Sequence, residues 1–122
     1  MPKKILIVDN DDFYIEIIST TIKLFLRQQV LSAGTVDEAW GTVTEEKPDL
    51  IIVNLDIAGR IGVDLVERLQ DDAETKTLPV LALSSTEDKK DEALGLGCVA
   101  FLHKPFKTRD LESEIVRLLQ LA

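Results

Sequence analysis

The chain has 122 residues with 22 acidic and 14 basic side chains, which give a formal net charge of -8. This length suits one domain with a single hydrophobic core, expected to span residues 1–122. The acidic balance argues against a nucleic-acid partner or an anionic membrane surface, since both would be repelled. No apolar run could cross a bilayer, no signal-peptide pattern is present, and Cys98 has no second cysteine to pair with. We therefore expect a soluble cytoplasmic protein that contacts other proteins.

The N-terminal part of the chain predicts a strand over 4–8 and a helix over 13–27. The polar cluster 9–12 lies between them, at the carboxyl end of the strand, and Asp12 is the expected helix cap. The residues expected on the sheet-facing side of this helix are Ile17, Ile18, Thr21, Leu24 and Phe25. A second apolar stripe, which is either more core or a partner surface, consists of Ile15, Ile22 and Leu26.

The middle of the chain predicts strands over 30–33 and 50–53, and helices that begin at Thr35 and over 63–70. Thr35 and Glu38 have the spacing of a capping box, and Trp40 in the same helix is expected to fill the core. Asn54 stands where the second of these strands ends. In open parallel α/β sheets the ligand crevice lies outside the carboxyl ends of the strands, so this position is where chemistry is expected.

The C-terminal part predicts strands over 79–83 and 99–102, each followed by a helix. Hydroxyl side chains at 84–86 are expected to cap a helix that begins near Glu87, and Thr108 to cap the last helix. The expected buried stripe of that helix is Leu111, Ile115 and Leu118.

The alternation of five buried strands with five helices indicates right-handed crossovers and a parallel sheet covered on both faces. We therefore predict an α/β fold, a doubly wound five-stranded sheet of the flavodoxin-like strand order 2-1-3-4-5. This order brings the ends of the first and third strands together, so Asp9, Asn10 and Asn54 become neighbours.

Four segments together resemble the receiver domain of two-component response regulators, and the likeness covers nearly the whole chain. The segments are I-L-I-V-D-N, P-D-L-I-I-V-N with Gly62 eight positions later, L-P-V-L-A-L-S and F-L-H-K-P-F. The resemblance implies that the acidic pair of the family's metal site falls on Asp9 and Asn10. It places the phosphate-accepting aspartate on Asn54, and the backbone carbonyl that completes the metal site on Asp56.

The same resemblance assigns switch positions. Ser84 matches the hydroxyl residue that contacts the phosphoryl group, and Lys104 matches the lysine that pairs with it, before a proline that is usually cis. Phe101 matches the aromatic position whose rotamer reports activation.

Two of these matches depart from the family at the chemistry itself. Phosphoryl transfer to a carboxylate needs an anionic nucleophile and a hard cation, but Asn54 is a neutral amide and Asn10 replaces an anionic metal ligand. We therefore expect that the chain is not an enzyme, that it holds no tightly bound cofactor, and that it binds Mg²⁺ weakly at best. Fewer clustered carboxylates also predict a domain that is more stable than an ordinary unliganded receiver. Lys104 is expected either to pair with Asp9 or to donate to the Asn54 carbonyl.

These departures predict a pseudo-receiver that acts as a protein-interaction module. Its candidate partners are a histidine kinase or an output domain, reached through the surface around residues 87–121, where Val116 and Leu119 are contact candidates; a weak homodimer is a further candidate. An alternative is a phosphorylatable receiver that uses Asp56 with Mg²⁺. In a third interpretation Asn54 is an engineered substitution, against which Asn10 argues, because blocking phosphorylation needs only one change.

Overall fold

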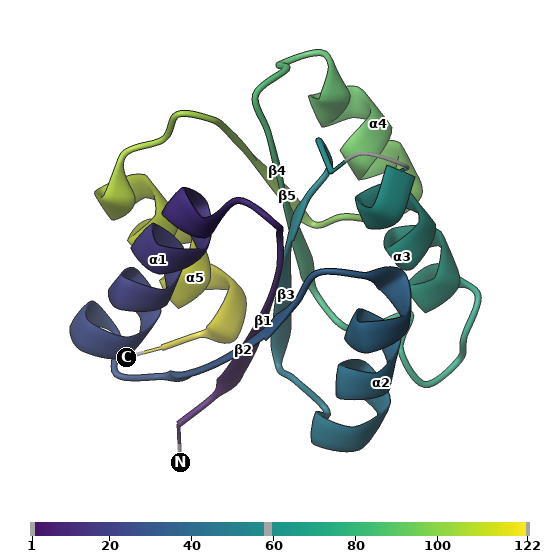
Figure 1. Ribbon diagram of the computed structural model, residues 1–122, viewed down its shortest axis with the longest axis horizontal. Coiled ribbons are helices and arrows are strands. Elements are labelled where there is room, and N and C mark those ends of the chain that lie inside the picture. The colour runs from purple at the N-terminus through teal and green to yellow at the C-terminus, as the bar shows by residue number, and fades with distance from the viewer. Residues whose placement is uncertain (1, 58–59, 122) are drawn as a thin grey trace.

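The computed structural model describes residues 2–57 and 60–121, which form a five-stranded parallel sheet between two helical layers (Figure 1). The strands, in chain order, are β1 Lys4–Val8, β2 Gln29–Ala33, β3 Leu50–Asn54, β4 Val80–Ser84 and β5 Ala100–His103. Their order in the sheet is β2-β1-β3-β4-β5. All four neighbouring pairs are parallel. The doubly wound, flavodoxin-like prediction is therefore confirmed.

The helices are divided between the two faces of the sheet (Figure 1). They are α1 Asp12–Thr20, α2 Val36–Glu46, α3 Ile61–Gln70, α4 Lys89–Leu96 and α5 Thr108–Leu119, with a π-helical segment, η1 Thr21–Phe25, after α1. α1 and α5 lie on one face, and α2, α3 and α4 lie on the other. Within the described part of the chain, no helix has the length and apolar character needed to cross a bilayer.

The hydrophobic core forms two layers, and successive strand residues alternate between them. In β1, Leu6 and Val8 belong to the cluster that includes residues of α2, α3 and α4. Ile5 and Ile7 belong to the cluster that includes residues of α1, η1 and α5. None of the four is more than 1% exposed. Burial on both faces explains why the strands appear in the sequence as continuous apolar runs.

The first helical segment departs from the predicted single α-helix. At η1, the Leu26 N–H donates to the Thr21 carbonyl at 3.1 Å, across five residues. A π turn contains more residues than an α turn, so the side chains that follow are rotated away from α-helical spacing. The prediction that Leu24 and Phe25 face the sheet is therefore wrong, since they are 70% and 67% exposed.

The second apolar stripe of this segment belongs to the core. Ile22 is fully buried, while Ile15 and Leu26 are partly buried and pack against the core cluster beneath α1 and α5. Of the residues predicted to face the sheet, Ile18 and Thr21 are buried.

Two helix starts differ from the prediction. Asp11, not Asp12, caps α1: its backbone is extended and its carboxylate accepts from the Phe13 N–H at 3.0 Å. α4 begins at Lys89 rather than near Glu87, and no side chain caps it. The predicted capping box of α2 is confirmed, because the Glu38 N–H donates to Thr35 Oγ1 at 3.1 Å.

The last helix also begins and packs differently in detail. Lys107 occupies the extended position before α5, so Thr108 is its first helical residue rather than its cap. Leu118 is half-buried, and the buried stripe is Leu111, Ile115 and Leu119, which follow one line at spacing of four. Leu119 is therefore a core residue and not a contact for another chain.

Trp40 is partly buried against the core, as expected for a core residue. The Arg68 guanidinium covers its ring at 4.2 Å from the centroid. This contact joins α2 to α3 on the outer surface of the helical layer.

Candidate functional site

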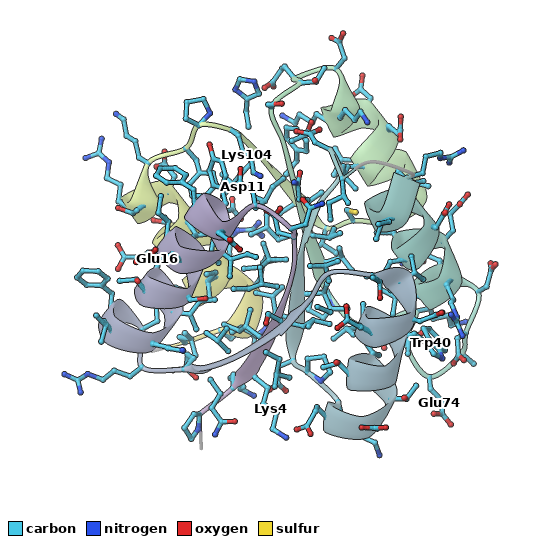
Figure 2. All side chains as sticks on the ribbon, in the orientation of Figure 1. Lys4, Asp11, Glu16, Trp40, Glu74 and Lys104 are labelled. Atoms are coloured by element: carbon cyan, nitrogen blue, oxygen red, sulfur yellow. The ribbon has the colours of Figure 1, made fainter. Side chains whose placement is uncertain are left out.

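The carboxyl ends of four strands bring the predicted site residues to one edge of the sheet. Asp9 follows β1, Asn54 ends β3, Ser84 ends β4 and Lys104 follows β5. Figure 2 shows Lys104 and Asp11 at this end of the molecule and Lys4 at the opposite end. An open pocket of about 370 Å³ lies here, lined by Asn10, Asp11, Tyr14, Asn54, Asp56, Ser85, Lys104 and Pro105.

Asp9 is the centre of the hydrogen-bond network at this edge. Its Oδ1 accepts from the backbone N–H groups of Asn10 at 2.7 Å and Asp11 at 3.0 Å. The same oxygen accepts from Asn54 Nδ2 at 3.0 Å. Its Oδ2 accepts from Lys104 Nζ at 3.3 Å. The carboxylate is only 1% exposed, so both of its oxygens are occupied by protein donors in a water-poor setting.

Lys104 forms the buried half of this ion pair. Its side chain is 6% exposed, and its Nζ lies 3.9 Å from the centroid of the Tyr14 ring. Of the two arrangements predicted for this lysine, the structure has the pair with Asp9. The ring adds a cation–π contact to the same ammonium group.

Asn54 is held by both ends of its amide. Nδ2 donates to Asp9, and Oδ1 accepts from the Asp56 N–H at 2.9 Å. The residue is 6% exposed. Its amide therefore links the end of β1 to the loop after β3, and it brings no negative charge to the pocket.

The Asp56 carboxylate crosses from the loop after β3 to the loop after β4. Its Oδ1 accepts from Ser84 Oγ at 2.6 Å, and its Oδ2 accepts from the Ser85 N–H at 2.7 Å and Ser85 Oγ at 2.8 Å. Partial burial acts to raise the pKa of Asp56, but the bonds from Ser84 and Ser85, with the charge of Lys104, outweigh it and leave the pKa below its ordinary value. From the sequence, Asp56 was assigned the backbone carbonyl of the metal site and, in the alternative interpretation, the role of phosphoryl acceptor, but no contact with Ser84 or Ser85. The one available signal for this contact is a carboxylate two residues past the end of β3, beside a strand that ends in Ser84 and is followed by Ser85.

The carboxylates at this edge are not arranged as ligands for a hard divalent cation. Mg²⁺ is usually held by one or two carboxylates in octahedral geometry. Here Asp9 is bonded to Lys104, the Asp11 carboxylate caps α1, and Asp56 is bonded to the two serines. Across residues 2–57 and 60–121, no group of three His, Cys, Asp or Glu side chains is placed to hold a metal ion.

The remaining site predictions lie around this network. Phe101, on β5, is partly buried against the cluster beneath α2, α3 and α4. The Lys104–Pro105 peptide bond is cis, as the resemblance implied. His103 is exposed, with Nε2 3.0 Å from the Ser85 carbonyl oxygen. The structure brings Asp9, Asn54, Asp56, Ser84 and Lys104 together, while the functional roles that the resemblance implies for them stay predictions.

The strand order and this set of strand-end residues define a receiver domain, and the comparison with known families agrees. The chain belongs to the response regulator receiver domain family, which matches residues 5–116. It is therefore a receiver domain of two-component signalling.

Individual relatives support the same assignment. The phosphate regulon transcriptional regulatory protein PhoB of Pseudomonas aeruginosa is 30% identical over 120 residues, which are 97% of this chain and 52% of that protein. The chain spans about half the length of such curated relatives. A putative response regulator from Chloroflexus aurantiacus superposes with a TM-score of 0.91 at 28% identity, covering 98% of this chain and 99% of that one. The chemotaxis response regulator CheY4 of Vibrio cholerae gives 0.87 at 25% identity, covering 98% of this chain and 100% of that one.

Proposed function

We propose that this receiver domain is a pseudo-receiver, which is not phosphorylated at Asn54 and acts as a protein-interaction module in the cytoplasm. The observation that carries the proposal is the Asn54 amide, whose two ends are bonded to Asp9 and to the Asp56 N–H. A phosphoryl acceptor must present an anionic oxygen to the phosphorus, and a neutral amide oxygen has very little nucleophilicity.

The surroundings of Asn54 support the same conclusion. Charge on a transferring phosphoryl group is usually offset by a divalent cation, but the Asp9 carboxylate accepts from Lys104 and from two backbone N–H groups. The pocket also carries the Asp11 and Asp56 carboxylates on its wall, which would repel an anionic phosphoryl donor.

On the segment 87–121, which is the expected partner surface, the exposed apolar side chains are different from those that the sequence indicated. Leu94 and Val99 are 46% and 49% exposed, whereas Leu119 is buried and Val116 is half-buried. We propose that a protein partner, such as a histidine kinase or an output domain, contacts the exposed pair.

A second candidate function is phosphorylation of Asp56. It is favoured by one observation, that this carboxylate contacts the Ser84 hydroxyl and lies within the field of Lys104. Against it, both oxygens already accept hydrogen bonds, which lower the nucleophilicity of a carboxylate.

Intact mass after incubation with acetyl phosphate and Mg²⁺ tests the proposal. The native chain is expected to gain no phosphoryl mass, and an Asn10→Asp/Asn54→Asp double variant, as the positive control, to gain one that hydroxylamine removes. A hydroxylamine-sensitive adduct on the native chain would overturn the proposal. If Asp56→Asn abolished that adduct, the acceptor would be Asp56.

A further inference from the structure

The segment 84–86, which joins β4 to the approach to α4, is held by an acidic side chain from another loop. Ser84 Oγ donates to Asp56 Oδ1 at 2.6 Å, and it also accepts from the Thr86 N–H at 3.0 Å. The Ser85 N–H and Oγ both donate to Asp56 Oδ2. Three donors from two adjacent residues therefore converge on one carboxylate.

These donors form a cradle of the kind that binds an oxyanion. Two hydroxyls and a backbone N–H aimed at two oxygens of one group give short, charge-assisted hydrogen bonds. Ser84 is fully buried, so its hydroxyl has few alternative partners. By the family resemblance, Ser84 is also the position that would contact a phosphoryl group. In this chain the anion at that hydroxyl is supplied by the protein itself.

The neighbouring strand holds the same segment from its other side. The Lys104 N–H donates to the Ser84 carbonyl at 2.8 Å, and His103 Nε2 lies 3.0 Å from the Ser85 carbonyl oxygen. With β5 on one side and the Asp56 carboxylate on the other, the segment is bonded along both of its edges.

We propose that the Asp56 carboxylate is a built-in anion that fills this cradle in place of a phosphoryl group and keeps the segment 84–86 ordered without phosphorylation. The inference rests on the proposed function in taking Asn54 as unphosphorylated. The partner surface that begins just after this segment is then present permanently. Regulation of the module would lie with the supply of its partner and not with a phosphoryl donor.

Backbone NMR relaxation of Asp56→Ala tests the inference. In the native protein we expect Ser85 and Thr86 amide order parameters near 0.85, as in rigid backbone. Without the carboxylate they should fall below about 0.6, and exchange of the Ser85 amide with water should rise by about tenfold, the effect of losing a bond of ~1.4 kcal/mol. Asp64→Ala, which removes an exposed carboxylate from α3, is the matched control and should leave both readouts unchanged.

Chemical rescue then tests the cradle itself. Sodium formate should restore the order of Ser85 and Thr86 in Asp56→Ala, while sodium chloride at equal ionic strength should not. Asp56→Asn, which keeps the side-chain shape but faces an NH₂ group toward a donor, should show the same loss as Asp56→Ala.

Three results would overturn the inference. They are native order parameters already low at Ser85, an Asp56→Ala variant as ordered as the native chain, and formate acting no better than chloride. None of these changes the phosphoryl-labelling result, and a phosphoryl adduct at Asp56 would instead overturn the proposed function.

Discussion

Asn54 and Asp9 hold each other across neighbouring strand ends, with Asn54 Nδ2 donating to Asp9 Oδ1 at 3.0 Å in a buried setting. A carboxylate at position 54 would have no proton for this bond at neutral pH and would place a second negative charge beside the first. The Asn54 amide thus gives the Asp9 carboxylate a hydrogen-bond donor and places no second negative charge beside it. This relationship leads to the first prediction.

Asn54→Asp is expected to destabilise the protein. Two like charges about 4 Å apart repel by roughly 4 kcal/mol at an effective dielectric of 20, and Lys104 offsets part of this. We therefore expect the free energy of unfolding, measured by urea titration at neutral pH, to fall by about 2 to 4 kcal/mol. Asn10→Asp, at an exposed position, is the control and should cost less than about 1 kcal/mol.

Added Mg²⁺ is expected to change the stability of the native chain and of the variants by different amounts. The Asn10→Asp/Asn54→Asp double variant gains a clustered set of carboxylates, so added Mg²⁺ should raise its stability, whereas the native chain should show no specific gain. If Mg²⁺ stabilised the native chain as strongly as the double variant, the conclusion that the native carboxylates do not fit a hard divalent cation would be contradicted.

The buried pair of Lys104 and Asp9 gives a second prediction. Asp9→Asn leaves the ammonium of Lys104, which is 6% exposed, without a counter-charge, and this should cost about 3 to 5 kcal/mol. Glu46→Gln breaks the surface pair with Lys4, whose side chains are 38% and 48% exposed, and should cost less than about 1 kcal/mol. If urea titration gave equal losses of unfolding free energy for the two variants, the buried pair would contribute no more to stability than the surface pair.

The sequence alone predicted the fold well because the strands are buried on both faces. Residues such as Leu6 and Ile7 alternate between two apolar layers, so each strand is a continuous apolar run bounded by polar residues. The position of Asn54 at a strand end follows from the same pattern. The approach of Asn54 to Asp9 then follows from the strand order.

Other features left no pattern in the sequence. The π-helical register of η1 depends on which carbonyl the Leu26 N–H bonds, and the same apolar residues fit an α-helix equally well. The bond from Ser84 to Asp56 spans 28 positions and depends on the paths of two loops. The hydroxyls of Ser84 and Ser85 were therefore predicted to cap the following helix, whereas they donate to the Asp56 carboxylate.

Paired truncations check the π-helical correction in η1. Ile22 is fully buried, so Ile22→Ala should cost about 2 to 5 kcal/mol of unfolding free energy through lost burial and the cavity it leaves. Leu24→Ala, two residues later at a 70% exposed position, should change stability by no more than about 0.5 kcal/mol. If urea denaturation gave the opposite ranking, the α-helical register of the sequence prediction would be the better description.

Cys98 gives a prediction about pH. Burial raises the pKa of its thiol from 9.0 to about 11. Because the folded-state pKa is raised, the thiol of the unfolded chain loses its proton at lower pH than the thiol of the folded protein. The free energy of unfolding therefore keeps its full value below pH 9 and falls by about 2 to 3 kcal/mol as the pH rises through 11. Urea titrations of the native chain and Cys98→Ala across this range should therefore converge by that amount as the pH rises. Parallel curves would show that the thiol titrates normally.

Gly62, in the first turn of α3, gives the last prediction. Glycine inside a helix normally costs roughly 0.5 to 1 kcal/mol relative to alanine, so Gly→Ala is usually stabilising. At Gly62, however, an added Cβ would lie 2.7 Å from the Asn54 carbonyl oxygen and 3.1 Å from Val53 Cγ2. The backbone of β3 cannot move aside without disturbing the Asn54 amide, so the close approach of helix and strand requires a glycine here.

Gly62→Ala is therefore expected to lower the free energy of unfolding by about 1 to 3 kcal/mol, as overpacking does. Gly41→Ala in α2 is the matched control, since nothing lies within 4 Å of its added Cβ, and it should raise stability by about 0.5 to 1 kcal/mol. Opposite signs for the two variants would locate the strain at the β3–α3 contact. A stabilising Gly62→Ala would mean that α3 can move away from Asn54. The idea that the contact between β3 and α3 holds the Asn54 amide in place would then be wrong.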